Sequence, residues 1–146
     1  MTDFLRSDAA DLAEDARHLL TELDREAPGV ANLTGECRPP LDVLETAQSV
    51  EVVVDVPGVQ IDSLRVAVRR STVLVVGAKQ PASNPSGARF HVAERAYGRF
   101  ARAVRIAGAI DASRATATVS AGQLRVVVPR IEDRRGKVIT IPVTRG

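Results

Sequence analysis

The feature that most limits the possible fold is a period-two alternation of apolar and polar residues, which begins near Leu41 and ends at Pro129. Side chains of a β-strand point alternately to its two faces, so this pattern predicts half-buried strands. The clearest run places four valines on one face: Val50, Val52, Val54 and Val56. Further short runs follow, and turn-forming residues such as Ala121-Gly122 separate them.

The spacing of these runs predicts how the strands pair. Connections of two to seven residues are too short for the crossovers that parallel strands need, so neighbouring strands should pair antiparallel. The fold class predicted is therefore all-β, an immunoglobulin-like antiparallel β-sandwich. Aromatic residues make up only 3% of the chain, so the core must be aliphatic, with valine as its main component.

Residues 1–27 have a different periodicity, which predicts an amphipathic helical arm. Leucine and alanine recur there at spacings of three and four, which is typical of one apolar stripe on a helix. The leucines of this stripe are Leu5, Leu12, Leu19 and Leu23. Pro28-Gly29 ends the helix. Two interpretations remain open: the stripe packs on the domain of its own chain, or it pairs with another subunit or an apolar partner.

Charge is distributed unevenly between this arm and the rest of the chain. Residues 1–27 carry a net charge of −5, whereas residues 28–146 carry +7. Opposite charges favour contacts between arm and body, within one chain or between chains, and salt should weaken them. The arginines of the body are spread along alternating strand faces, so we interpret them as a solvated surface and expect no nucleic-acid partner.

Several classes of function find no support in the sequence. The charged fraction is 26% and the first residues are acidic, so we expect no membrane insertion, no secretory signal and a cytoplasmic protein. Cys37 is the only cysteine, which excludes an intramolecular disulfide and a zinc finger. His18 and His91 stand in no motif that positions a nucleophile. We therefore expect no enzyme activity, no cofactor and no metal.

The last segment of the chain, residues 131–146, is predicted to be an extension rather than part of the sandwich. Its first half is charged, and three apolar residues then alternate: Ile139, Ile141 and Val143. Pro142 has no N–H to donate to a ladder, so this segment belongs at a sheet edge or on another molecule.

Four pieces of sequence, in order, resemble the α-crystallin domain of the small heat-shock proteins, in its bacterial form. They are PPLDVLET (39–46) with VDVPG (54–58), VVGAK (75–79), ERAYGRFAR (94–102) and AGQLRVVVPR (121–130). The ITI at 139–141 resembles the tail motif of that family. We therefore divide the chain into an arm (1–27), a linker (28–39), an α-crystallin-like β-sandwich domain (40–130) and a C-terminal extension (131–146).

The resemblance implies an ATP-independent holdase chaperone of the stress response, which binds partly unfolded client proteins and forms dimers that assemble into larger oligomers. It implies that a strand near Arg89 to Ala93 crosses to the partner subunit, with Phe90, His91 and Arg102 at the dimer interface. Arg102 shares its strand face with apolar residues, where an unpaired charge is costly. The main alternative is an adaptor or structural protein on the same sandwich, such as a co-chaperone or a gas-vesicle accessory protein.

Edge strands bind extended segments through main-chain hydrogen bonds and through pockets for alternate side chains. We expect the tail, with either Ile139 and Ile141 or Ile141 and Val143 as the docking pair, to bind an edge groove that also holds client segments. The residues predicted to line this groove are Leu64, Val66, Val68, Leu124, Val126 and Val128.

Overall fold

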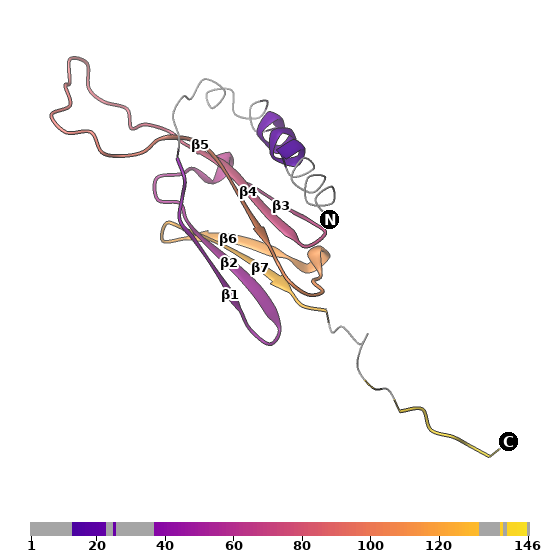
Figure 1. Ribbon diagram of the computed structural model, residues 1–146. Coiled ribbons are helices and arrows are strands. Elements are labelled where there is room, and N and C mark those ends of the chain that lie inside the picture. The colour runs from indigo at the N-terminus through magenta and orange to yellow at the C-terminus, as the bar shows by residue number, and fades with distance from the viewer. Residues whose placement is uncertain (1–12, 23–24, 26–36, 132–137, 139, 146) are drawn as a thin grey trace, which may run out of the picture.

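The computed structural model describes residues 13–22, 25, 37–131, 138 and 140–145, and these form a β-sandwich with a helix beside it (Figure 1). Within the described residues one sheet has four strands in the order β1-β2-β7-β6, and the other has three in the order β3-β4-β5. All neighbours pair antiparallel. The strands are β1 Leu41–Glu45, β2 Ser49–Asp55, β3 Arg65–Arg69, β4 Thr72–Lys79, β5 Gly98–Arg105, β6 Thr116–Ser120 and β7 Gln123–Pro129. The predicted antiparallel sandwich is confirmed.

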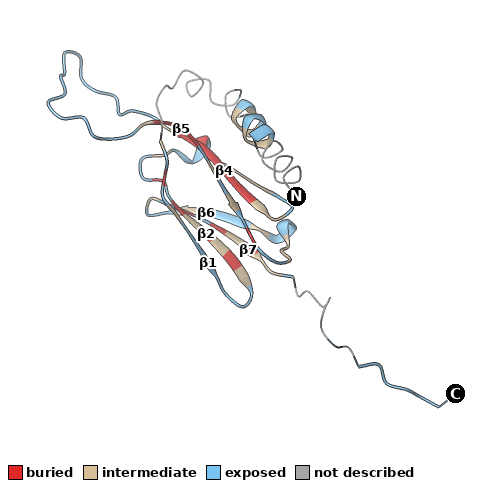
Figure 2. Ribbon diagram, viewed as in Figure 1, coloured by how far each residue is buried: buried red, intermediate tan, exposed pale blue. Residues whose placement is uncertain are grey.

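The period-two alternation places the valines in the core. On β2 every second residue from Val50 is buried, and the same holds on β7 from Leu124. The antiparallel register sets Val52 opposite Val126, so buried residues of the two strands lie side by side. From the second sheet, Val73 and Val75 join the same core. Figure 2 shows buried segments on strands of both sheets.

The hairpin between β6 and β7 has the geometry that its two turn residues predict. Ala121 has φ of 52° and Gly122 has φ of 73°, so both lie in the left-handed region. Turns of this kind match the right-handed twist of the flanking strands and hold two-residue hairpins tight. Two short 3-10 helices in other connections, η2 (Ile61–Ser63) and η3 (Ala112–Arg114), were not expected from the pattern.

Strand β4 differs from the other strands because both of its faces are buried. Val73 and Val75 point into the sandwich core, whereas Leu74 and Val76 lie on the outer face of the three-stranded sheet and are also buried. The helix formed by residues 13–22, called the arm helix below, lies along this three-stranded sheet (Figure 1).

Two described segments leave the sandwich. The connection between β4 and β5, residues 80–97, has no strand or helix and projects from one end of the domain (Figure 1). At the other end, residues 140–145 extend away from the domain without forming a strand. None of the helices in the described part of the chain has the length and apolar character needed to cross a membrane.

Candidate functional site

The described part of the tail is exposed and in no strand of its own domain. Ile141 is 79% exposed and Val143 is 98% exposed, while Ile139 lies outside the described residues. Within the part of the chain that the structure describes, these large apolar side chains are left almost uncovered. The tail therefore has its apolar side chains available for another molecule, and the choice of docking pair stays a prediction.

The predicted groove must be corrected on one of its two sides. Leu124, Val126 and Val128 are at most 2% exposed, because β7 is an inner strand between β2 and β6. Side chains of this kind fill the core and offer no surface to a tail or a client. Alternation showed that this face is buried, but it could not show whether the strand lies inside a sheet or at its edge.

The residues predicted for the other side of the groove lie at the edge of a sheet, and their role in binding the tail or a client stays a prediction. Leu64, Val66 and Val68 are half-buried and pack against the core at β3, which ends the three-stranded sheet. The corresponding edge of the four-stranded sheet is β6, where Val119 is half-buried and packs against the same core. Sequence reasoning missed Val119, although the hairpin turn at Ala121-Gly122 already paired β6 with β7.

Arg102 lies on the face that its position predicts, and its partner belongs to its own chain. It shares the inner parity of β5 with Phe100 and Val104 and is half-buried. Its guanidinium Nη1 donates a hydrogen bond of 2.7 Å to the carbonyl oxygen of Pro39, a buried residue just before β1. Arg102 therefore ties the start of the sandwich to β5, and its role at a dimer interface stays a prediction.

The projecting loop carries the other two predicted interface residues. Phe90 is 68% exposed and Val92 is 72% exposed, and His91 between them is exposed as well. No strand forms in residues 80–97. Edge strand β1 has two exposed apolar residues of its own, Val43 and Leu44. Both the loop and this edge therefore present apolar side chains that the single chain does not cover.

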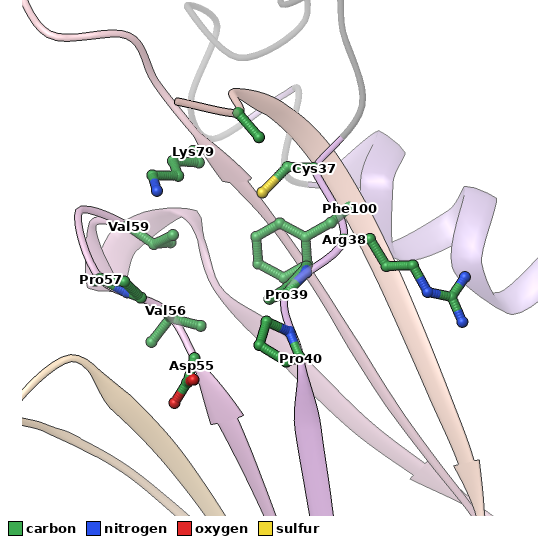
Figure 3. A pocket seen from close by; sticks show the side chains of 11 residues that line it. Cys37, Arg38, Pro39, Pro40, Asp55, Val56, Pro57, Val59, Lys79 and Phe100 are labelled. Atoms are coloured by element: carbon green, nitrogen blue, oxygen red, sulfur yellow. The ribbon is translucent and has the colours of Figure 1, made fainter. Parts of the chain in front are cut away.

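A pocket of about 290 Å³ lies at the base of this loop (Figure 3). The Phe100 ring and several prolines give it apolar walls, and the Cys37 sulfur points into the same region. Its lining residues are Cys37, Arg38, Pro39, Pro40, Asp55, Val56, Pro57, Val59, Lys79, Ala96 and Phe100. Among the described residues no three His, Cys, Asp or Glu side chains gather as a metal site. The pocket offers shape and apolar surface rather than a set of reactive groups.

The arm helix packs on the domain of its own chain, which is the first of the two interpretations that the sequence left open. Leu19 is half-buried, whereas Leu5, Leu12 and Leu23 lie outside the described residues. The Asp15 carboxylate accepts hydrogen bonds of 2.7 and 2.9 Å from Nη1 of Arg69 on β3. At the far end of the helix, Nη2 of Arg99 on β5 lies 3.5 Å from the carbonyl oxygen of Leu20.

Known proteins similar to this chain are heat-shock proteins. An 18 kDa heat shock protein of Streptomyces albus G is 31% identical over 102 residues, which are 68% of this chain and 71% of that protein. An 18.9 kDa heat shock protein of Oryza sativa subsp. japonica is 32% identical over 105 residues. That match covers 71% of this chain but only 59% of the plant protein, so the chain spans about three fifths of this relative.

A solved structure gives the same result. Heat shock protein 16.0 from Schizosaccharomyces pombe superposes with a TM-score of 0.64 at 30% identity, over 73% of this chain and 100% of that one. The model of the Hsp20/alpha crystallin family matches residues 42–144, which include the sandwich and most of the tail. The resemblance seen in the sequence motifs is thereby confirmed. The chain belongs to the Hsp20/alpha crystallin family, the small heat-shock proteins, a family of stress-response chaperones.

Proposed function

We propose that this chain is an ATP-independent holdase, which binds partly unfolded proteins and keeps them from aggregating, and which works as an oligomer of dimers. The observation that carries the proposal is the position of the exposed apolar residues. Phe90 and Val92 lie on a projecting loop, and Ile141 and Val143 lie on an extended tail. Segments of this kind suit contacts with other chains, whereas a large apolar patch on a single domain favours aggregation.

For the dimer, we propose that residues 89–93 of one chain add to the free edge of β1 in a second chain. An edge strand presents unpaired N–H and C=O groups, which an extended segment can satisfy. The exposed side chains of Val43 and Leu44 on β1 provide apolar surface for Phe90 and Val92. In the dimer the edge of β1 would gain main-chain hydrogen bonds, and the exposed apolar side chains of both elements would be covered.

For the higher assembly, we propose that the tail binds at the open edge of the sandwich formed by β3 and β6. The half-buried side chains there include Val66 and Val119. Burial of two tail side chains yields about 3–6 kcal/mol before the cost of ordering the tail, which is weak for one contact. Contacts repeated around a closed oligomer become strong, because each later contact forms within an assembly that already exists.

The test has two parts that use the full chain. Aggregation of a heated model client is followed by light scattering without nucleotide, and multi-angle scattering gives the mass of the assembly. Two variants separate the possible docking pairs, Ile139→Ala with Ile141→Ala and Ile141→Ala with Val143→Ala. The variant that removes the docking pair should remain a folded dimer and lose the large species.

Val138→Ala provides the matched control, because Val138 is as exposed as Val143 but has the opposite parity in the extended tail. It should keep the mass of the parent. If both double variants keep the parent's mass and subunit-exchange rate, the tail is not the clamp. If the parent chain leaves client aggregation unchanged, the holdase proposal fails and an adaptor role on the same fold becomes the better explanation.

A further inference from the structure

The outer face of the three-stranded sheet combines an apolar centre with a frame of arginines. Leu74 and Val76 form the centre on β4 and are at most 4% exposed. The strand register places small residues beside them, Ala67 on β3 next to Leu74 and Ala101 on β5 next to Val76. Small neighbours let a helix approach a sheet closely, so this face is shaped to be covered.

Four arginines occupy the two ends of the same face. Arg69 and Arg105 flank Thr72 at one end of β4, because all three share one register row. Toward the other end, Arg65 is paired with Val76 and Arg99 with Ala78. These arginines are far apart in the sequence, and only the pairing of the strands brings them together. The pairing of the strands thus places all four arginines on one face of the sheet, which their spacing in the sequence did not predict.

The arm helix covers this face with the complementary chemistry. Its half-buried apolar residues are Ala16, Leu19 and Leu20. Asp15 binds Arg69 through both carboxylate oxygens, at 2.7 and 2.9 Å. The polar side of the helix, with Arg17 and His18, remains exposed. The face is thus occupied by an amphipathic helix that carries a carboxylate where the arginine frame begins.

This contact is suited to release. The side chain of Arg69 is 55% exposed and that of Asp15 is 31% exposed, so water and salt screen the ion pair. On β5, Ala101 and Ala103 remain exposed beside the helix. A tethered helix whose apolar residues are only half-buried and whose ion pair is screened can be displaced by a competitor with the same chemistry.

We propose that this arginine-framed apolar face is a client-binding surface for amphipathic helices with an acidic polar side, and that the arm helix occupies it as a tethered competitor. The inference rests on the proposed holdase function and names the chemistry of the client segment. Binding of such a helix in trans would require the arm to leave. Salt would release the arm and would also weaken the charged part of client binding.

The test measures binding of a fluorescent peptide to the full chain by anisotropy. The probe is an unrelated amphipathic peptide with a leucine and alanine stripe and a glutamate polar side, and its control has lysine in place of glutamate. The key variant is Asp15→Arg, which repels Arg69. It should bind the acidic probe about ten-fold more tightly than the parent, because a tethered competitor acts at an effective concentration near the millimolar range.

Three control variants test whether the change in affinity depends on the ion pair between Asp15 and Arg69. Glu14→Arg changes the charge by the same amount at an exposed neighbouring position and should leave the affinity unchanged. Arg69→Glu should weaken the arm but gain no affinity, because the probe loses the same arginine. Arg69→Glu combined with Asp15→Arg restores an ion pair of reversed polarity and should return the affinity to the parent's value or below. The lysine peptide should bind neither the parent nor Asp15→Arg measurably.

Equal affinity of the acidic probe for the parent and Asp15→Arg, or equal binding of acidic and lysine probes, would overturn the inference. A peptide with the sequence of residues 7–25 that binds where the unrelated probe does not would also overturn it, since the face would then be a site for the arm of a second copy. Client aggregation is measured in parallel. Suppressed aggregation without probe binding contradicts only this inference, whereas probe binding without suppression contradicts only the holdase proposal.

Discussion

The outer faces of the two sheets differ in the way they meet their surroundings. On the four-stranded sheet the outward residues are mainly polar, and Glu51 on β2 pairs with Arg125 on β7 at 2.5 Å. An antiparallel sheet commonly faces water in this way on one side. On the three-stranded sheet the outward Leu74 and Val76 are buried, and the arm helix lies along this sheet. The outer face of the four-stranded sheet can therefore face water, whereas the apolar outer face of the three-stranded sheet needs another element to pack on it.

Strand β4 shows what this difference teaches. Val75 and Val76 are adjacent and equally buried, at 1% and 0% exposure. Val75 is covered by the opposite sheet, which cannot leave without unfolding the domain. Val76 lies on the outer face of its sheet, and the arm helix that lies along this sheet is joined to the domain through a linker. Two side chains that are equally buried in a static structure can therefore require very different free energies to become exposed to water.

The largest expected effect tests this contrast directly. Val75→Asp places a carboxylate in the sandwich core and should cost about 3–5 kcal/mol, the loss typical of an uncompensated buried charge. Val76→Asp should cost only about 1–2 kcal/mol, because the arm can lift and allow water to reach the carboxylate. Urea denaturation at one fixed protein concentration measures both. Equal large losses would show that the outer face is as permanent a core as the inner one.

A second, smaller effect compares arginines on the two faces of β5. Arg102→Ala removes the hydrogen bond to the buried Pro39 carbonyl and should cost about 1.5–3 kcal/mol, as expected for a charged donor. Arg105→Ala, on the exposed outer side, should cost less than about 1 kcal/mol. Thermal melting ranks the two variants, and light scattering at low concentration shows whether Arg102 also supports the dimer. A parent-like melt and mass for Arg102→Ala would remove both roles.

The smallest expected effect concerns two of the surface ion pairs, Asp15 with Arg69 and Glu51 with Arg125. Asp15→Asn and Glu51→Gln should each change stability by less than about 1 kcal/mol, since exposed pairs contribute little. Only Asp15→Asn should speed tryptic cleavage in the arm, because Arg17 lies on the helix that this pair holds in place. Cleavage of the parent should also speed up as salt rises. If Glu51→Gln exposes the arm equally, the ion pair of Asp15 is not what retains it.

Alternation was sufficient to predict the sandwich but not the edges of its sheets. The valines of β2 are buried as their parity requires, and the left-handed Ala121-Gly122 turn appears where the sequence placed it. The prediction of the groove was wrong on one side, because alternation makes Val126 buried whether its strand lies inside a sheet or at its edge. That distinction depends on strand order, which arises from contacts between residues distant in sequence.

The sequence pattern also could not predict where the arm packs on the domain. A net charge of −5 in residues 1–27 against +7 in the remainder indicated an attraction, but not its location. The location depends on Arg69 and Arg99 reaching one face of a sheet. Their spacing along the chain gives no sign of this, since β3 and β5 become neighbours of β4 only through the fold.

The hairpin between β6 and β7 has a consequence for the heat tolerance of the protein. Ala121 holds φ of 52°, a conformation in which an L-alanine is strained and a glycine or asparagine is not. The free energy of unfolding of the domain could therefore be raised at this turn, which connects edge strand β6 to β7. The proposed holdase has to stay folded at temperatures that unfold its clients. A residue suited to the left-handed region at this one position would raise the temperature at which the sandwich itself begins to open.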